Sequence, residues 1–211
     1  MRRFYKLQDE KNSLTKINTE LELNFLKSQI NPHFLFNTLN NIYSLALQKN
    51  DKAPEMIIKL SDLMRYMLYE CNVEKNDLQK EVQFMRDYIE LEKLRHGTDV
   101  EIDFLVSGDL RNKGIPPLLL IPFVENAFKH GVNAQFGKSW VKINLTANDD
   151  TFTFHIENNK PVNGNVVTKR GHGIGIENTK KRLHLIYPGR HRLSIHEEHH
   201  IYSVALEVFT V

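Results

Sequence analysis

The chain has 211 residues, enough for one ordinary domain or for a helical module followed by a domain of about 100–150 residues. Hydrophobic residues make up 41% and charged residues 26%, the balance of a folded protein rather than of a disordered one. The net charge of +2 comes without a long basic block, so we expect no nucleic-acid partner. The single cysteine, Cys71, excludes an internal disulfide and a multi-cysteine zinc site, and fits a reducing cytoplasm.

The longest apolar run, Ile115–Val124, contains three prolines and is much shorter than the ~20 residues of a membrane-spanning helix. We therefore expect attachment to a membrane only through a region that precedes this sequence.

Residues 1–28 predict a coiled-coil signalling helix. Leu7, Leu14 and Leu21 are seven residues apart, the spacing of a parallel two-helix coiled coil. The alternative is a single amphipathic helix that packs on its own domain.

Residues 29–96 predict a helical region that dimerises. Apolar residues recur three and four apart from Ile30 to Leu47, and Pro54 suits the first turn of a second helix. A third helix runs to about His96, where Gly97 is the expected C-cap. Two helices joined by a short turn form a hairpin, and hairpins from two chains form a four-helix bundle, so we expect a homodimer.

Residues 97–211 change in character, because apolar residues now alternate along short segments. These patterns predict an α/β sandwich with a mixed sheet, and hence an α+β protein overall. The expected strands lie near 100–106, 141–145, 152–156, 193–196 and 202–208, and the expected helices near 118–130 and 176–186.

His33 is the first candidate for chemistry. Pro32 precedes it directly, and Gln29 and Asn37 lie four residues to either side, on the same face of a helix. Two amides beside a neutral imidazole can hold one tautomer and leave the other ring nitrogen free to attack. Taken alone, these residues are explained more simply by a core histidine beside a helix kink.

A second group of polar residues lies on the otherwise apolar helix 118–130. Asn126 can supply an oxygen to Mg²⁺, Glu125 can act as a general base, and Lys129 and His130 lie on a neighbouring part of the helix. Lys129 can neutralise phosphate charge. The alternative is an amphipathic helix that ends at Gly131.

A third group is a glycine-rich turn before the last helix. Gly171, Gly173 and Gly175 let backbone N–H groups approach a ligand, and the helix N-terminus that follows favours an anion. By itself this turn is also compatible with a plain flexible loop.

Together, these segments resemble the LytS-like branch of the sensor histidine kinases, from about Leu26 to Val211. Residues 31–37 are similar to that family's phosphoacceptor box, residues 125–131 to its N-box, and residues 171–178 to its second glycine box.

The resemblance implies that residues 97–211 form a GHKL-type ATP-binding domain and that His33 accepts the γ-phosphate of ATP. It implies that a response-regulator aspartate then receives the phosphoryl group. It also implies roles for individual residues: catalysis by His33, Mg²⁺ binding by Asn126, a lid at Lys160–Arg170, and nucleotide contacts by Asn126, Lys129, His130, Asn158, Gly171, Gly173 and Gly175. Many histidine kinases have an acidic residue directly after the phosphoacceptor, whereas Phe34 follows His33 here, so Glu125 is the candidate catalytic base. The parent protein would be an inner-membrane sensor.

The sequence departs from the family's adenine-binding pattern, Asp-x-Gly. Asn158 stands at the aspartate position and Lys160 at the glycine position. An Asn oxygen still accepts a hydrogen bond from the adenine amine, at a cost of about 1 kcal/mol in lost charge assistance. We therefore expect weak ATP binding. The alternatives are a degenerate kinase that acts as a dimeric binding scaffold, and a GHKL ATPase that performs conformational work.

Overall fold

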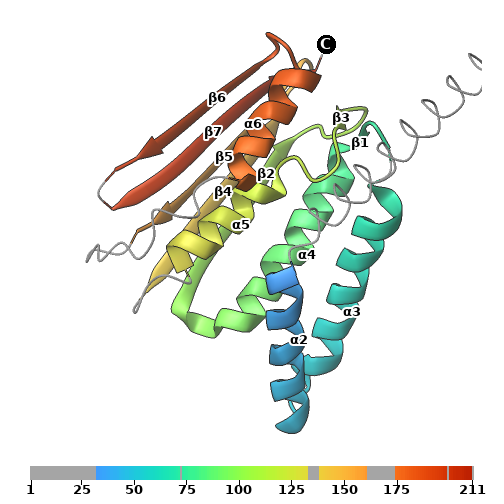
Figure 1. Cartoon of the computed structure of the whole chain (residues 1–211), viewed down its shortest axis with the longest axis vertical. Helices are drawn as coiled ribbons and strands as arrows, with labels where there is room; N and C mark the ends of the chain where they lie inside the picture. Colours follow the sequence, from blue (N-terminus) through green and yellow to red (C-terminus); the bar gives the residue numbers. More distant parts are fainter. Residues whose placement is uncertain (1–31, 72, 133–137, 161–173, 199, 211) are drawn as a thin grey trace, which may run out of the picture.

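A computed structural model describes residues 32–71, 73–132, 138–160, 174–198 and 200–210. The first part is helical. Helices α2 (Pro32–Leu47) and α3 (Lys52–Arg65) form a hairpin, and α4 (Leu78–His96) packs beside α3 (Figure 1). One turn of π-helix, η1 (Tyr66–Glu70), continues α3. The hairpin, the position of Pro54 in the first turn of α3 and the C-cap at Gly97, with φ of +63°, are confirmed.

The second part is a five-stranded mixed sheet in the order β2-β4-β5-β7-β6. Only the pair β2–β4 is parallel, and the other neighbours are antiparallel. The strands are β2 (Val100–Gly108), β4 (Ser139–Ala147), β5 (Thr151–Asn159), β6 (His191–Glu197) and β7 (Ile201–Phe209).

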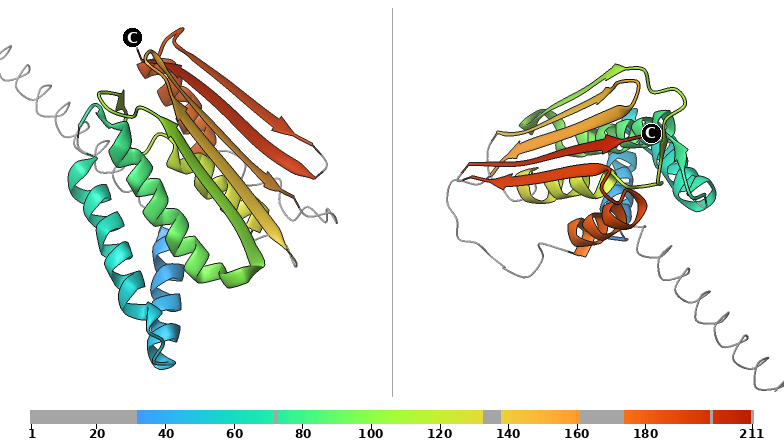
Figure 2. Two further views of the ribbon diagram at one scale, coloured as in Figure 1. Left: turned by 180° about the vertical axis from the view of Figure 1, so that it is seen from behind. Right: turned by 90° about the horizontal axis from the view of Figure 1, so that it is seen from above.

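Helices α5 (Ile121–Ala127) and α6 (Ile174–Ile186) cover one face of this sheet, as Figure 2 shows from above. A second π-helical turn, η3 (Phe128–Val132), continues α5. Every second residue of β4 is buried, the pattern of a strand with one face on the core. The rings of Phe123 on α5 and Phe154 on β5 are tilted against each other with centroids 6.1 Å apart, and both side chains are buried between the helices and the sheet. The predicted α+β class and mixed sheet are therefore confirmed.

The helix predicted from Leu118 begins three residues later, at Ile121. Leu118 has φ of +55°, in the left-handed region, which cannot continue a right-handed helix. A short antiparallel pair, β1 (Asn76–Asp77) with β3 (Gly114–Ile115), also went unpredicted. It joins the start of α4 to the loop that leads to Leu118.

The proposed coiled coil lies at residues 1–28, outside the described residues. The boundary at residue 96 stays a prediction, because α4 contacts both α3 and β2. Among the residues that the structure describes, no helix is both long enough and apolar enough to span a membrane.

Candidate functional site

Asn158 provides a buried polar group near the end of β5, the middle strand of the sheet. It lies on β5, opposite Val141 of β4 and Tyr202 of β7, and its side chain is 1% exposed. Its Nδ2 donates a hydrogen bond to the backbone oxygen of Asn159 at 3.0 Å. Within the described part of the chain, its Oδ1 has no hydrogen-bond partner. Because a buried acceptor without a donor costs free energy, this oxygen fits a ligand that brings a donor.

Gly131 packs directly against this amide. A Cβ at position 131 would lie 2.4 Å from Asn158 Nδ2, 2.8 Å from its Cγ and 2.9 Å from its Cβ. Real Cβ atoms do not approach neighbours so closely, so only a glycine fits here. The π-helical turn η3 thus brings the end of the N-box segment onto the side chain at the end of β5.

The remaining described candidates come from α5, η3 and α6. Glu125 and Asn126 are partly buried on α5, and Lys129 is exposed on η3. Gly175 lies in the first turn of α6, where a Cβ would be 3.8 Å from Cβ of Pro122 on α5. The start of α6 and the N-box helix are therefore neighbours. Gly171, Gly173, residues 161–170 of the lid predicted at Lys160–Arg170, and the side chains of His33 and His130 lie outside the described residues.

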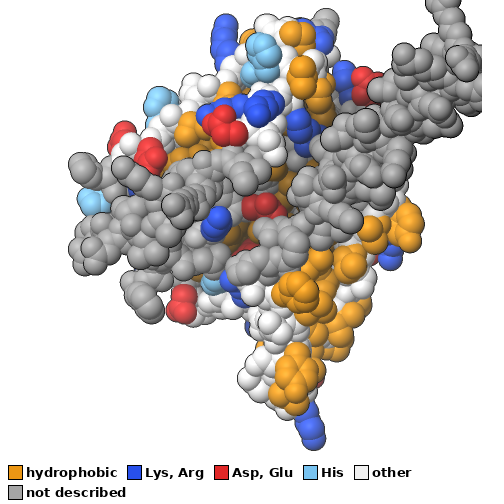
Figure 3. Space-filling model, in the orientation of Figure 1, with side chains coloured by type: hydrophobic (Ala, Val, Ile, Leu, Met, Phe, Trp, Pro, Cys, Tyr) orange, Lys and Arg blue, Asp and Glu red, His pale blue; other side chains and the backbone are white. Residues whose placement is uncertain are grey.

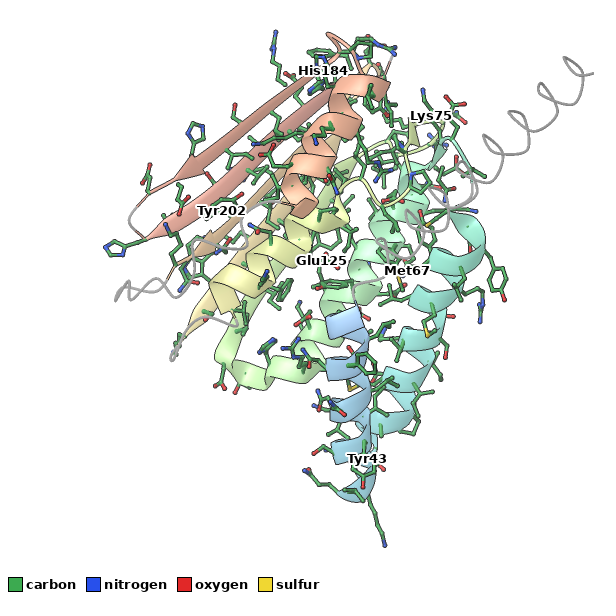
Figure 4. All side chains as sticks on the ribbon, viewed as in Figure 1. Tyr43, Met67, Lys75, Glu125, His184 and Tyr202 are labelled. Carbon is green, nitrogen blue, oxygen red and sulfur yellow. The ribbon has the colours of Figure 1, made fainter. Side chains whose placement is uncertain are left out.

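Glu125 also faces the helical hairpin. It lines a cavity of about 20 Å³ together with Phe34 and Leu35, the two residues that follow His33 on α2. Figure 4 shows Glu125 on α5, close to the start of α2. The fold thus brings the candidate base and the segment that carries His33 to the same small space.

An aromatic stack joins these elements, and the sequence analysis did not identify it. The rings of Phe34 and Tyr88 stack with centroids 4.5 Å apart, and Tyr88 meets Phe128 of η3 edge-on at 6.0 Å. Burial raises the pKa of Tyr88 well above 10, and the nearby carboxylates of Glu92 and Glu125 raise it further. Tyr88 follows Phe84 by four residues on the apolar face of α4, which was the available signal.

Lys160 stands where the resemblance leads us to expect a glycine, and its side chain makes its contacts at the β6–β7 turn. Its Nζ donates to Oε1 of Glu197 at 2.7 Å and to the backbone oxygen of Glu198 at 3.2 Å. Its backbone N–H donates to the oxygen of His200 at 2.8 Å. The lysine side chain is therefore used in a contact between strands.

Comparison with known proteins gives consistent matches. The histidine kinase family model matches residues 21–100. Sensor protein LytS of Oceanobacillus iheyensis is 30% identical over 188 residues, covering 82% of this chain and 32% of that protein. Sensor histidine kinase YpdA of Escherichia coli is 32% identical over 181 residues, with the same coverage. The chain thus spans about a third of the length of these curated relatives.

Among solved structures, the histidine kinase domain of the blue-light activated kinase EL346 from Erythrobacter litoralis aligns with a TM-score of 0.47 and 13% identity. The alignment covers 90% of this chain and 95% of that chain.

Proposed function

Because this chain belongs to the LytS-like sensor histidine kinases, we propose that it autophosphorylates His33 from ATP. The phosphoryl group then passes to an aspartate in the receiver domain of a response regulator. The chain would be the cytoplasmic part of a two-component sensor whose N-terminal region lies in the membrane.

The observation that carries this proposal is the unpartnered Oδ1 of Asn158. The amide is oriented by its bond to the Asn159 oxygen, so the group presented to a ligand is an acceptor. The exocyclic amine of adenine is a donor, whereas guanine presents an oxygen at the corresponding position. Asn158 therefore suits adenine and rejects guanine.

Residues of the N-box and the glycine box would bind the phosphates of the nucleotide. Lys129 would neutralise phosphate charge, and the backbone near Gly175, with Gly171 and Gly173, would donate N–H groups. His130 is a further candidate contact of the nucleotide.

An Asn126 oxygen fits Mg²⁺, which prefers oxygen ligands and phosphates. Among the described residues, no group of three or more His, Cys, Asp or Glu side chains could hold a metal, so the nucleotide phosphates would complete its coordination. Bound Mg²⁺ supplies charge neutralisation.

Glu125 is our candidate for the general base. Its position beside Phe34 and Leu35 supports a contact between its carboxylate and the His33 imidazole. A carboxylate that accepts a hydrogen bond from one ring N–H fixes the tautomer and makes the other nitrogen a better nucleophile. The stack of Phe34 on Tyr88 would hold this segment of α2 against the N-box helix.

The homodimer is supported by an apolar face on the hairpin. Phe36 and Tyr43 on α2 are 66% and 65% exposed, in a fold whose other apolar side chains are mostly buried. Figure 3 shows hydrophobic side chains gathered over α2 and α3. Such a patch marks an interface, and a second hairpin would complete a four-helix bundle. The large exposed apolar residues of these helices are Phe36, Leu39, Tyr43, Leu47, Ile57, Ile58 and Met64.

The second candidate function is a scaffold with little catalysis, favoured by Asn158 at the aspartate position. The pairing of Lys160 with Glu197 argues against it, because that lysine makes its contact at the β6–β7 turn.

Calorimetry with Mg²⁺ and either ATP or GTP tests the nucleotide site. We expect weak binding of ATP and about 5- to 150-fold weaker binding of GTP, since one mismatched donor–acceptor pair costs about 1–3 kcal/mol. Asn158→Ala should lower ATP affinity, whereas Asn144→Ala, an exposed asparagine on β4, should not. No heat with millimolar ATP would refute the nucleotide site and leave the scaffold.

A further inference from the structure

A buried polar cluster lies where four elements meet, and the mechanism above does not use it. It consists of Tyr66 on η1, Glu81 on α4, Leu118 in the loop before α5, and Arg182 on α6. Glu81 has no exposed surface, which is rare for a carboxyl group unless it is hydrogen-bonded or paired with a charge. We call this group the Glu81 cluster.

One oxygen of Glu81 holds two partners from different elements. The hydroxyl of Tyr66 donates to Oε1, and the backbone N–H of Leu118 donates to the same oxygen at 2.9 Å. Asn76 Nδ2 donates to the Tyr66 oxygen at 3.0 Å. The π-helical end of the hairpin is thus connected through one carboxylate to the loop that precedes the N-box helix.

Arg182 holds the same loop from the other side. Its Nη2 donates to the oxygen of Pro117 at 2.7 Å, and its Nη1 donates to the oxygen of Leu118 at 3.4 Å. The N–H of Leu118 is therefore bound to α4 and its C=O to α6. Because the first turns of α6 belong to the glycine-box segment at 171–178, this contact connects that segment to the loop that leads into the N-box helix.

Leu118 needs this support, since a leucine at φ of +55° adopts a conformation that costs about 1–2 kcal/mol. Removal of the bonds would let this residue relax toward negative φ, which would turn the chain that enters α5. Leu118 and Glu125 line the same small cavity beside Phe34, so the turn and the candidate base are one packed unit.

We propose that Glu81 and Arg182 are positioning residues: by holding the backbone at Leu118, they fix the direction in which α5 begins and hence the position of Glu125. We propose further that Tyr66 transmits movement of the hairpin to the backbone at Leu118. The proposal rests on the proposed kinase function for its effect on rate. Its structural part, the control of α5 by the cluster, is independent of that function.

The first test compares Glu81→Ala with Glu81→Gln in the whole chain. Alanine removes the acceptor, whereas the glutamine oxygen still accepts both bonds. We expect Glu81→Ala to lower the autophosphorylation rate at saturating ATP about tenfold or more, with the KM for ATP changed less than about threefold. Amide hydrogen exchange of residues 118–127 should accelerate about tenfold. Glu81→Gln should remain within about threefold of wild type in both measurements.

The second test uses Tyr66→Phe, which removes only a hydroxyl and guards against a loss of folding. Its control is Tyr187→Phe, because Tyr187 is also buried and donates one bond, at 3.2 Å to the oxygen of Gly114, outside the cluster. We expect Tyr66→Phe to slow phosphorylation and to accelerate amide hydrogen exchange in residues 118–127, and we expect Tyr187→Phe to do neither.

Unchanged exchange at residues 118–127 in both Glu81→Ala and Tyr66→Phe would overturn the proposal. So would equal effects of Glu81→Ala and Glu81→Gln. If wild type itself gives no phosphoprotein while exchange responds as expected, the kinase function fails and the control of α5 stands.

Discussion

Gly131→Ala should damage nucleotide binding by displacing Asn158. The new Cβ would lie 2.4 Å from Nδ2 and 2.8 Å from Cγ of that side chain, so one of the two must move. Overpacking of this kind costs about 1–3 kcal/mol of folding free energy, and the lost hydrogen bond to adenine costs about 1 kcal/mol of binding free energy. We therefore expect the Kd for ATP to rise about fivefold or more.

The assay is calorimetry with ATP and Mg²⁺ on Gly131→Ala, Asn158→Ala and the double variant. Because Gly131→Ala acts through Asn158, it should add little to the loss already caused by Asn158→Ala. Gly114→Ala is the matched control, since its nearest neighbour is the flexible Cδ of Lys75 at 3.3 Å. Wild-type affinity in Gly131→Ala, or full additivity in the double variant, would refute this explanation.

Three further predictions follow from the same geometry. Glu125→Gln should slow autophosphorylation about 100-fold or more while ATP affinity stays within about threefold; an unchanged rate would assign the base to another group. Leu39→Glu should raise the dissociation constant of the dimer about 100-fold in analytical ultracentrifugation, and Leu185→Glu, also an exposed leucine but on α6, should not. Burial raises the pKa of Glu81 from 4.5 to about 7, against the lowering effects of Tyr66, the Leu118 N–H and Arg182. Because the folded state favours the neutral acid, the stability that Glu81 contributes is present below about pH 4.5 and is lost as the pH rises to about 7. In urea unfolding, the free energy of unfolding of wild type relative to Glu81→Gln should therefore fall by about 3 kcal/mol across this range. A difference that does not change with pH would contradict this prediction.

Much of the fold follows from local patterns. Alternation of apolar residues predicted the five long strands of the sheet, and the spacing of three and four predicted α2. These signals are strong because one face of each element is buried. The C-cap at Gly97 was predictable because a helix end with positive φ favours glycine.

What the patterns missed depends on contacts between distant parts of the chain. The sequence predicted a helix at Leu118 because the apolar residues that follow it are helical. Buried hydrogen bonds with Glu81 and Arg182 instead hold the Leu118 backbone in the left-handed region. Glu81 was a usable signal, because it shares a helical face with the buried residues Leu78 and Met85.

In the candidate site, too, the sequence predicted some features and missed others. The N-box and glycine-box residues could be selected by chemical type and resemblance alone. The packing of Gly131 on Asn158, and the contact of Lys160 with Glu197, could not be predicted, because each joins segments more than twenty-five residues apart in sequence. Side-chain direction at such contacts is set by the tertiary fold.

Incubation with γ-labelled ATP and Mg²⁺, comparing wild type with His33→Gln, tests the central claim most directly. We predict an acid-labile and alkali-stable label on wild type and none on His33→Gln, with equal nucleotide affinity in the two proteins. Equal labelling of His33→Gln would contradict the assignment of the acceptor. A wild-type protein that binds ATP but takes up no label at millimolar ATP would contradict the kinase itself.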